Sequence, residues 1–159
     1  MKTLEERVRV LEDIESIKRL KARYCAACDD NYNAEAIAAL FTEDAIWDGA
    51  GLGKAEGGEK IRQFFRGAPR IFPFAIHHVM NPIIEVEGDS ARGQWYLLQP
   101  ATRMRQSEGK AAEKQAVWLA ASYDEQYVRT ADGWKFKHLK VTARFLTPYE
   151  EGWAKKQFV

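Results

Sequence analysis

The stretch that decides the fold runs Ala75-Ile76-His77-His78-Val79-Met80-Asn81-Pro82-Ile83-Ile84-Glu85-Val86-Glu87-Gly88-Asp89. Beta-branched and long apolar residues dominate it, which is typical of a strand, and Gly88-Asp89 has the chemistry of a hairpin turn. Successive side chains of a strand point to opposite faces, so His77 and His78 cannot face the same way. The chain has only three histidines, and histidine is the side chain that titrates near neutrality without perturbation. We therefore expect one of the pair to face whatever this strand covers.

Length and composition fit a single globular domain over residues 1–159, large enough to bury about 70% of its unfolded surface. Hydrophobic residues make up 46% and charged residues 30%, as in ordinary globular proteins. A net charge of +1 gives no reason to expect a nucleic acid or an anionic membrane as partner. No apolar run reaches the roughly 18 residues of a membrane span, and the first residues lack the apolar region of a signal peptide. We expect a cytoplasmic protein.

A long amphipathic helix is predicted at the start of the chain. Thr3 and Glu6 have the spacing of a capping box. From there, apolar residues recur at steps of three and four as far as Cys28, which predicts one helix or two helices with a break near Asp13. Its first turns, within residues 1–12, are expected to extend beyond the core as an arm.

Two shorter helices and two short strands are predicted next. Asn33 can cap a helix over residues 34–41, and a further helix is expected over residues 59–66. Between them we expect a strand over residues 45–47 and a glycine-rich hairpin loop with a short strand around residues 54–56. No Gly-Lys-Ser/Thr follows these glycines, so the loop is not predicted to bind phosphate.

Everything after residue 66 has the pattern of a sheet. Strands over residues 90–103, 114–129 and 134–145 follow the central stretch. This order predicts an α+β fold in which a curved antiparallel or mixed sheet wraps around three N-terminal helices as a cone. The mouth of such a cone is a natural pocket for a small apolar molecule. Aromatic residues are either pocket lining or ordinary core. The lining candidates are Trp47, Phe64, Phe65, Phe72, Phe74, Trp95, Tyr96, Trp118 and Phe145.

Several short stretches carry the pattern of a known family. They are Ile17-Lys18-Arg19-Leu20-Lys21-Ala22-Arg23-Tyr24, Asp29-Asp30, Ala38-Ala39-Leu40-Phe41-Thr42-Glu43-Asp44-Ala45, His77 with Asn81, and Asp132-Gly133-Trp134-Lys135-Phe136. Over roughly residues 10–150 the chain resembles the SnoaL-like branch of the nuclear-transport-factor-2-like superfamily. The resemblance implies the cone fold and a homodimer or homotrimer. It is weak for the reaction, because the scaffold hosts dehydratases, dehydrohalogenases, isomerases, cyclases and plain binding proteins.

Within that branch, the local patterns are most similar to bile-acid dehydratase, scytalone dehydratase and hexachlorocyclohexane dehydrochlorinase. Those enzymes pair a histidine of the third strand with an aspartate just past the first helix to remove a proton during elimination. The resemblance implies that His77, four residues before Asn81, is the base. Counting along the helix from Tyr24 makes Asp29 its partner, whereas counting back from the next strand makes it Asp30. We favour Asp29, because a rigid helix transmits register better than a loop does.

An Asp–His pair suits elimination chemistry. The carboxylate holds one imidazole nitrogen protonated, leaves the other free to accept a proton, and stabilises the imidazolium that forms. Tyr24, on the same helix, can donate a hydrogen bond to a developing oxyanion or leaving hydroxyl. Where the bile-acid dehydratase has an acid, this chain has Gln99, which can orient a substrate but cannot exchange a proton. By strand alternation His78 is expected at solvent or an interface, and His138 is expected at the surface.

Three functions stay open at this point. The first is a cofactor-independent lyase acting on a small apolar cyclic substrate, with His77 as base. The second is an isomerase or cyclase that uses the aspartate itself as proton shuttle. The third is a non-catalytic binding or assembly protein with the same cone. Contact between His77 and an aspartate inside a pocket would favour the lyase.

Metal and cofactor chemistry are not predicted. Three scattered histidines without a His-x-x-x-His motif do not predict a zinc site. Cys25 and Cys28 have redox spacing, but they lie late in a helix, where no helix dipole lowers a thiol pKa, so we expect buried thiols. The chain has neither a dinucleotide fingerprint nor a nucleophile elbow, and we expect no cofactor.

The last residues, 148–159, are polar with two large aromatics, Trp153 and Phe158. We expect them to fold over the cone mouth as a lid or to pack on a neighbouring subunit. A loose tail is the alternative, since termini are often poorly ordered.

Overall fold

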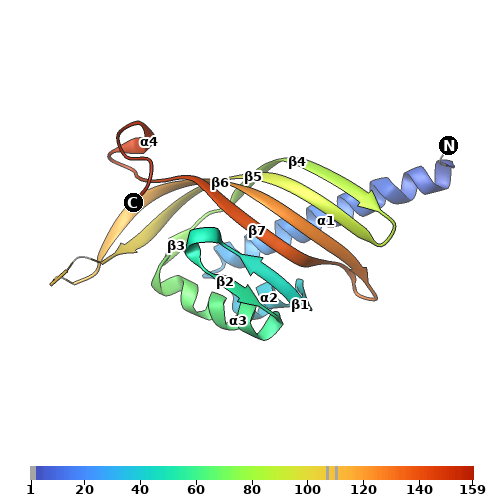
Figure 1. The fold of residues 1–159 in the computed structure, drawn as a ribbon, viewed down its shortest axis with the longest axis horizontal. Coiled ribbons are helices and arrows are strands. Elements are labelled where there is room, and N and C mark those ends of the chain that lie inside the picture. Colours follow the sequence, from blue (N-terminus) through green and yellow to red (C-terminus); the bar gives the residue numbers. More distant parts are fainter. Residues whose placement is uncertain (1–2, 107, 110) are drawn as a thin grey trace.

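A computed structural model describes residues 3–106, 108–109 and 111–159, and it has helices first and a sheet after them (Figure 1). The α+β prediction is confirmed. The elements are α1 (Leu4–Asp29), α2 (Ala34–Ala38), β1 (Phe41–Asp48), η1 (Ala50–Leu52), β2 (Lys54–Glu56), α3 (Gly58–Gly67), η2 (Ala68–Arg70), β3 (Phe74–Ala75), β4 (His78–Glu87), β5 (Ser90–Arg105), β6 (Glu113–Thr130), β7 (Gly133–Pro148) and α4 (Gly152–Lys155).

The sheet is mixed and curved. Its seven strands run in the order β2-β1-β7-β6-β5-β3, and β4 also pairs with β5. Among the named strands of the described residues, only the pairing of β1 with β7 is parallel. Figure 1 shows the long strands β4–β7 arching past α1, while α3 lies beside β1 and β2. The helices therefore cover one face of the sheet, and a cavity can form between the helices and that face.

Helix α1 is a single helix, so the alternative of a break near Asp13 is wrong. The capping box is confirmed: the Glu6 N–H donates to the Thr3 hydroxyl and the Thr3 N–H donates to the Glu6 carboxylate. Asp13 is buried, and its carboxylate accepts from Arg129 at 2.7 Å and from the Trp134 indole at 3.1 Å. The Arg129 guanidinium holds the pKa of Asp13 below its usual value. Asp13 thus connects α1 to the sheet through these hydrogen bonds, and the helix continues past it.

The first turns of α1 lie outside the core. Leu4 is 74% exposed and Leu11 is 65% exposed, whereas Ile17 and Leu20 are fully buried. Figure 1 shows this end of the helix projecting past the strands. Among the described residues, no helix is long and apolar enough to cross a membrane.

The predicted boundaries shift where neighbouring elements compete. Helix α2 ends at Ala38, before the predicted residue 41, because Phe41 is recruited into β1 opposite Phe136 of β7. The central stretch is not one strand: β3 and β4 are separated, and β4 contains a bulge. At the bulge Asn81 has a left-handed φ of 53°, and Asn81 and Pro82 together oppose the single residue Trp95.

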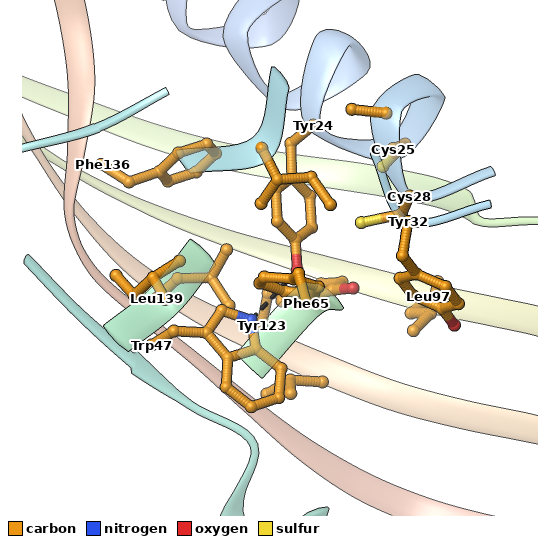
Figure 2. Packing of buried hydrophobic residues seen from close by; sticks show 14 of the residues in the cluster. Tyr24, Cys25, Cys28, Tyr32, Trp47, Phe65, Leu97, Tyr123, Phe136 and Leu139 are labelled. Carbon is orange, nitrogen blue, oxygen red and sulfur yellow. Dashed lines mark hydrogen bonds between the residues drawn. The ribbon is translucent and has the colours of Figure 1, made fainter. Parts of the chain in front are cut away.

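Buried aromatic and thiol side chains fill the space between α1 and the sheet (Figure 2). The Tyr24 ring packs edge-on against Phe136, with ring centroids 5.5 Å apart, and against Phe65, at 6.3 Å. Cys25 and Cys28 are free and buried in the same cluster. Burial raises the pKa of the Cys25 thiol to about 11 and raises that of Cys28 further. The expectation of buried thiols agrees with this environment.

This environment predicts a loss of stability in alkali. The Cys25 pKa is about 11 in the folded chain against 9.0 normally. The stability that follows from keeping this thiol neutral is therefore fully present below about pH 9 and is lost between about pH 9 and pH 11. The free energy of unfolding should fall by at most about 2–3 kcal/mol over this pH range. Urea midpoints measured across this range should fall more steeply for the wild type than for Cys25→Ala. Parallel curves would contradict the prediction.

A buried ion pair crosses the core between α1 and β6. The Lys21 ammonium donates to the Glu125 carboxylate at 2.5 Å, and both side chains are fully buried. The other Glu125 oxygen accepts from the Tyr127 hydroxyl, which in turn accepts from the Trp95 indole at 3.0 Å. Every charge in this network is therefore paired by a partner that also makes a hydrogen bond, which is what burial in a low-dielectric interior requires.

The C-terminal residues lie on the outer face of the sheet, so the expectation that they form a lid over the cone mouth is wrong. The Trp153 ring of α4 stacks on Phe145 of β7, with centroids 5.0 Å apart. Leu146 pairs with Phe158. An apolar groove, which we call the outer groove, surrounds this stack and is lined by Tyr96, Leu98, Trp118, Phe145 and Trp153.

Candidate active site

His77 and Asp29 meet at the end of α1. Asp29 is the last residue of this helix, and His77 lies between β3 and β4. The imidazole Nδ1 is 2.7 Å from Asp29 Oδ1, and the His77 backbone N–H donates to the same carboxylate at 3.0 Å. Because Asp29 receives Nδ1–H, the other ring nitrogen, Nε2, is left as an acceptor. We call this arrangement the Asp29–His77 dyad.

The dyad lies at a helix end, and its two side chains differ in exposure. The C-terminal end of a helix carries a partial negative charge, and the dyad lies at the C-terminal end of α1. The His77 side chain is 6% exposed, whereas that of Asp29 is 30% exposed. The imidazole ring is therefore shielded from water, while its carboxylate partner keeps some hydration.

The structure pairs His77 with Asp29 and not with Asp30, the other candidate. Its carboxylate accepts from the Asn33 side chain at 3.0 Å and is exposed. The reason is that α1 continues through Asp29, and the chain turns only afterwards. His78 also lies apart, exposed on β4, as alternation predicts. His138, expected at the surface, is only partly exposed, and its Nε2 is buried without a partner among the described residues.

A cavity of about 220 Å³ opens beside the imidazole, between the helices and the inner face of the sheet. Ligand sites are typically about 300–1,000 Å³, and an apolar cavity of about 150 Å³ already holds benzene. The space therefore suits a single substituted ring. The lining residues are Tyr24, Tyr32, Trp47, Leu52, Phe64, Phe65, Gly67, Ala68, Ile71, Phe72, His77, Leu97, Gln99, Leu119, Tyr123 and Val141.

Six residues singled out in the sequence line the cavity: Tyr24, Trp47, Phe64, Phe65, Phe72 and Gln99. Tyr24 accepts a hydrogen bond from the Trp47 indole at 3.1 Å, drawn as a dashed line in Figure 2. Burial raises the pKa of Tyr24 well above its usual value, with smaller contributions from Cys28 and Tyr123. The hydroxyl therefore stays protonated at neutral pH, which the role of hydrogen-bond donor requires.

Five of the predicted lining aromatics do not line the cavity, for different reasons. Tyr96 lines the outer groove instead. Phe74 is 52% exposed because its neighbour Ala75 takes the buried face of β3. Trp95 faces inward but is used by the Tyr127 hydrogen bond away from the cavity. Trp118 points into the outer groove. Phe145 does so too, because a bulge places it opposite Ala120 and shifts the alternation of β7.

Two further tyrosines of the wall, Tyr32 and Tyr123, were not among the predicted residues. Tyr123 could have been found by alternation, since Leu119 and Tyr123 are four residues apart on one strand and both face the cavity. Tyr32 lies in a turn, where no periodicity applies. Within the described ranges, no group of three or more His, Cys, Asp or Glu side chains could hold a metal ion.

Comparison with known proteins adds the family. A family model described as a SnoaL-like domain matches residues 9–140. An uncharacterized protein of Mycobacterium tuberculosis is 28% identical over 126 residues, which cover 79% of this chain and 81% of that protein.

Two solved structures illustrate the shared fold. A hexachlorocyclohexane dehydrochlorinase from Novosphingobium barchaimii has a TM-score of 0.75 at 25% identity, covering 89% of this chain and 92% of that one. A suspected aromatic ring hydroxylase from Novosphingobium aromaticivorans has a TM-score of 0.74 at 26% identity, covering 87% and 94%. With the family model spanning both members of the dyad, the chain belongs to the SnoaL-like family of the nuclear-transport-factor-2-like superfamily.

Proposed function

We propose that the chain is a cofactor-independent lyase that eliminates water, or a comparable leaving group, from a small and largely apolar cyclic substrate. The observation that carries this proposal is the 2.7 Å contact between His77 Nδ1 and Asp29 beside an apolar cavity. A dehydrochlorinase among the structural relatives supports the same reaction class, since its named activity is an elimination.

The proposed reaction uses only groups that the chain supplies. His77 Nε2 accepts a proton from a substrate carbon, and the electron pair of that C–H bond forms the new double bond. The bond to the leaving hydroxyl breaks, and the imidazolium returns its proton to that hydroxyl, which departs as water. Asp29 holds the ring and stabilises its transient charge. The apolar walls exclude competing water.

Two observations argue against the alternative functions. Asp29 hydrogen-bonds His77 and is absent from the described cavity lining, so it is poorly placed to shuttle a proton on the substrate itself. A pure assembly protein has no need of a cavity of about 220 Å³ with a histidine in its wall. The lyase therefore remains the leading proposal.

The test is an elimination assay on simple ring substrates without added cofactor. β-Hydroxycyclohexanone and β-chlorocyclohexanone should both be converted to cyclohexenone, whose conjugated absorbance reports the product. We expect a rate at least about 10²-fold above buffer, the lower range for general base catalysis. Ethylbenzene, which has a ring but no leaving group, should compete. If both ketones and their five- and seven-membered analogues bind but none reacts, the lyase proposal is wrong.

A further inference from the structure

The first turns of α1 carry apolar side chains that the rest of the chain does not cover. Leu4 is 74% exposed, Val8 is 44% exposed and Leu11 is 65% exposed. Steps of four and three residues place all three on one side of a helix that turns about 100° per residue. The same geometry puts them roughly opposite Ile17 and Leu20, which are buried in the core. We call Leu4, Val8 and Leu11 the arm stripe.

The arm stripe lies on a well-defined helix outside the body of the domain. We call residues 4–12 of α1 the arm. The capping box of Thr3 and Glu6 fixes its start, and Figure 1 shows it extending past the strands. The family model matches the chain only from residue 9, so Leu4 and Val8 precede the matched segment. The arm stripe is therefore a feature of this chain that the family match does not explain.

The spacing of the arm stripe is that of a coiled-coil seam. With Leu4 and Leu11 at the d positions of a heptad, Val8 takes the a position between them. A β-branched residue at a with leucine at d favours a parallel pair of helices. The seam ends there, because Glu15 and Lys18 occupy the next a and d positions and lie 3.9 Å apart within the chain. The arm stripe thus fits one partner helix over about two turns.

The charges beside the arm stripe select the direction of that partner helix. Arg7 takes a g position and Glu12 the following e position, one on each side of the stripe. Neither forms an ion pair with another described residue of the chain. In a parallel pair, Arg7 of each helix faces Glu12 of the other. An antiparallel pair would instead bring e positions against e positions, and here both of these, Glu5 and Glu12, are acidic.

We infer that the arm stripe binds the arm of a second copy of this chain, in a short parallel two-stranded coiled coil with Arg7 of each copy beside Glu12 of the other. The two copies are then related by a two-fold axis that runs between the arms. A contact of two helical turns is small, and small interfaces are weak and reversible on their own. The contact is independent of the lyase proposal, because no residue of the arm lines the described cavity.

Single cysteines in the arm test which residues of the two copies meet. In a parallel pair, Leu4→Cys and Leu11→Cys should each form a covalent dimer with a short bis-maleimide, seen on a denaturing gel. Arg9→Cys is the matched control, because Arg9 is exposed on the same turns but lies off the arm stripe. Cys25 and Cys28 are buried, so the wild type should stay unlinked. We expect at least about tenfold more dimer than in the control, because a formed contact raises the effective thiol concentration from micromolar toward millimolar.

Exchange of the two charges tests the direction and the register. Arg7→Glu, made in the Leu11→Cys chain, places an acid against Glu12 at both symmetric positions. Association should weaken by about fivefold or more, the effect of turning two exposed ion pairs into repulsions, and the dimer yield should fall with it. Adding Glu12→Arg restores opposite charges and should recover the yield. Both residues are exposed, and both replacements are good helix formers, so the arm itself should stay helical.

Three results would overturn the inference. Yields of Leu4→Cys and Leu11→Cys no higher than that of Arg9→Cys would mean that the arm stripe does not meet a second copy. A higher yield in a mixture of the Leu4→Cys and Leu11→Cys chains than in either alone would make the pair antiparallel. A yield that Arg7→Glu does not lower, or that Glu12→Arg does not restore, would show that these charges do not face each other.

Discussion

Replacing His77 with glutamine is expected to lower kcat for elimination by about 10²–10⁴-fold, the usual contribution of general base catalysis. Glutamine keeps a polar group of similar reach, but it cannot accept and return a proton at neutral pH. Substrate binding should change little, since the cavity wall stays largely intact. The effect therefore belongs in kcat, with KM nearly constant, when ring-ketone turnover is followed by absorbance.

His78→Gln is the matched control, because it changes the neighbouring residue on the opposite, exposed side of the chain. It should leave kcat within about twofold, as expected for a surface substitution. Asp29→Asn should also be strongly impaired, by up to about 10⁴-fold, the loss seen when the orienting carboxylate of a serine-protease triad becomes an amide. The double variant should be no worse than the more damaged single variant, since the two residues act as a unit. A loss below tenfold in His77→Gln would place the base elsewhere.

The largest stability effect is expected from breaking the buried pair of Lys21 and Glu125. Lys21→Met leaves the Glu125 carboxylate fully buried without its cation. Removing one partner of a buried ion pair costs about 3–5 kcal/mol. For a chain of this size each kcal/mol lowers Tm by about 2–4 °C, so Tm should fall by about 6–20 °C. Urea unfolding and calorimetry both measure it.

A second substitution separates the unpaired charge from the lost packing. Lys21→Met combined with Glu125→Gln should recover most of the stability, because the amide is neutral and can still accept from Tyr127. Lys18→Met is the surface control, since Lys18 is 46% exposed and lies 3.9 Å from Glu15. It should change stability by no more than about 0.5 kcal/mol. A Lys21→Met variant within about 1 kcal/mol of wild type would show that the charge is not isolated.

The fold could be predicted because its signals are local. The capping box of Thr3 and Glu6, the apolar spacing of α1 and the turn at Gly88-Asp89 each depend on neighbours in sequence. The lining of the cavity depends instead on curvature and on bulges. Alternation alone cannot show that a bulge in β7 turns Phe145 outward, nor that Trp95 forms a hydrogen bond to Tyr127 instead of lining the cavity.

The candidate site was predictable in its residue types and ambiguous in its register. The resemblance pointed to His77 and to one of two adjacent aspartates. The choice between Asp29 and Asp30 depends on where α1 ends, and helix ends are uncertain by one or two residues. The burial of Lys21 could also have been predicted, because this residue lies on the buried face of α1, four residues after Ile17. Its partner Glu125 lies 104 residues away and has no local signal.

The bulge in β4 has a consequence for how the molecule behaves at high concentration. β4 flanks β5 at one margin of the sheet, so an incoming strand from a neighbour that docks on this strand would pair along it. Pro82 has no N–H to offer, and left-handed Asn81 breaks the even spacing of the remaining groups. A docking strand therefore finds no long, regular row of free N–H and C=O groups on β4. This edge strand resists fibre growth without a helix or loop that covers it.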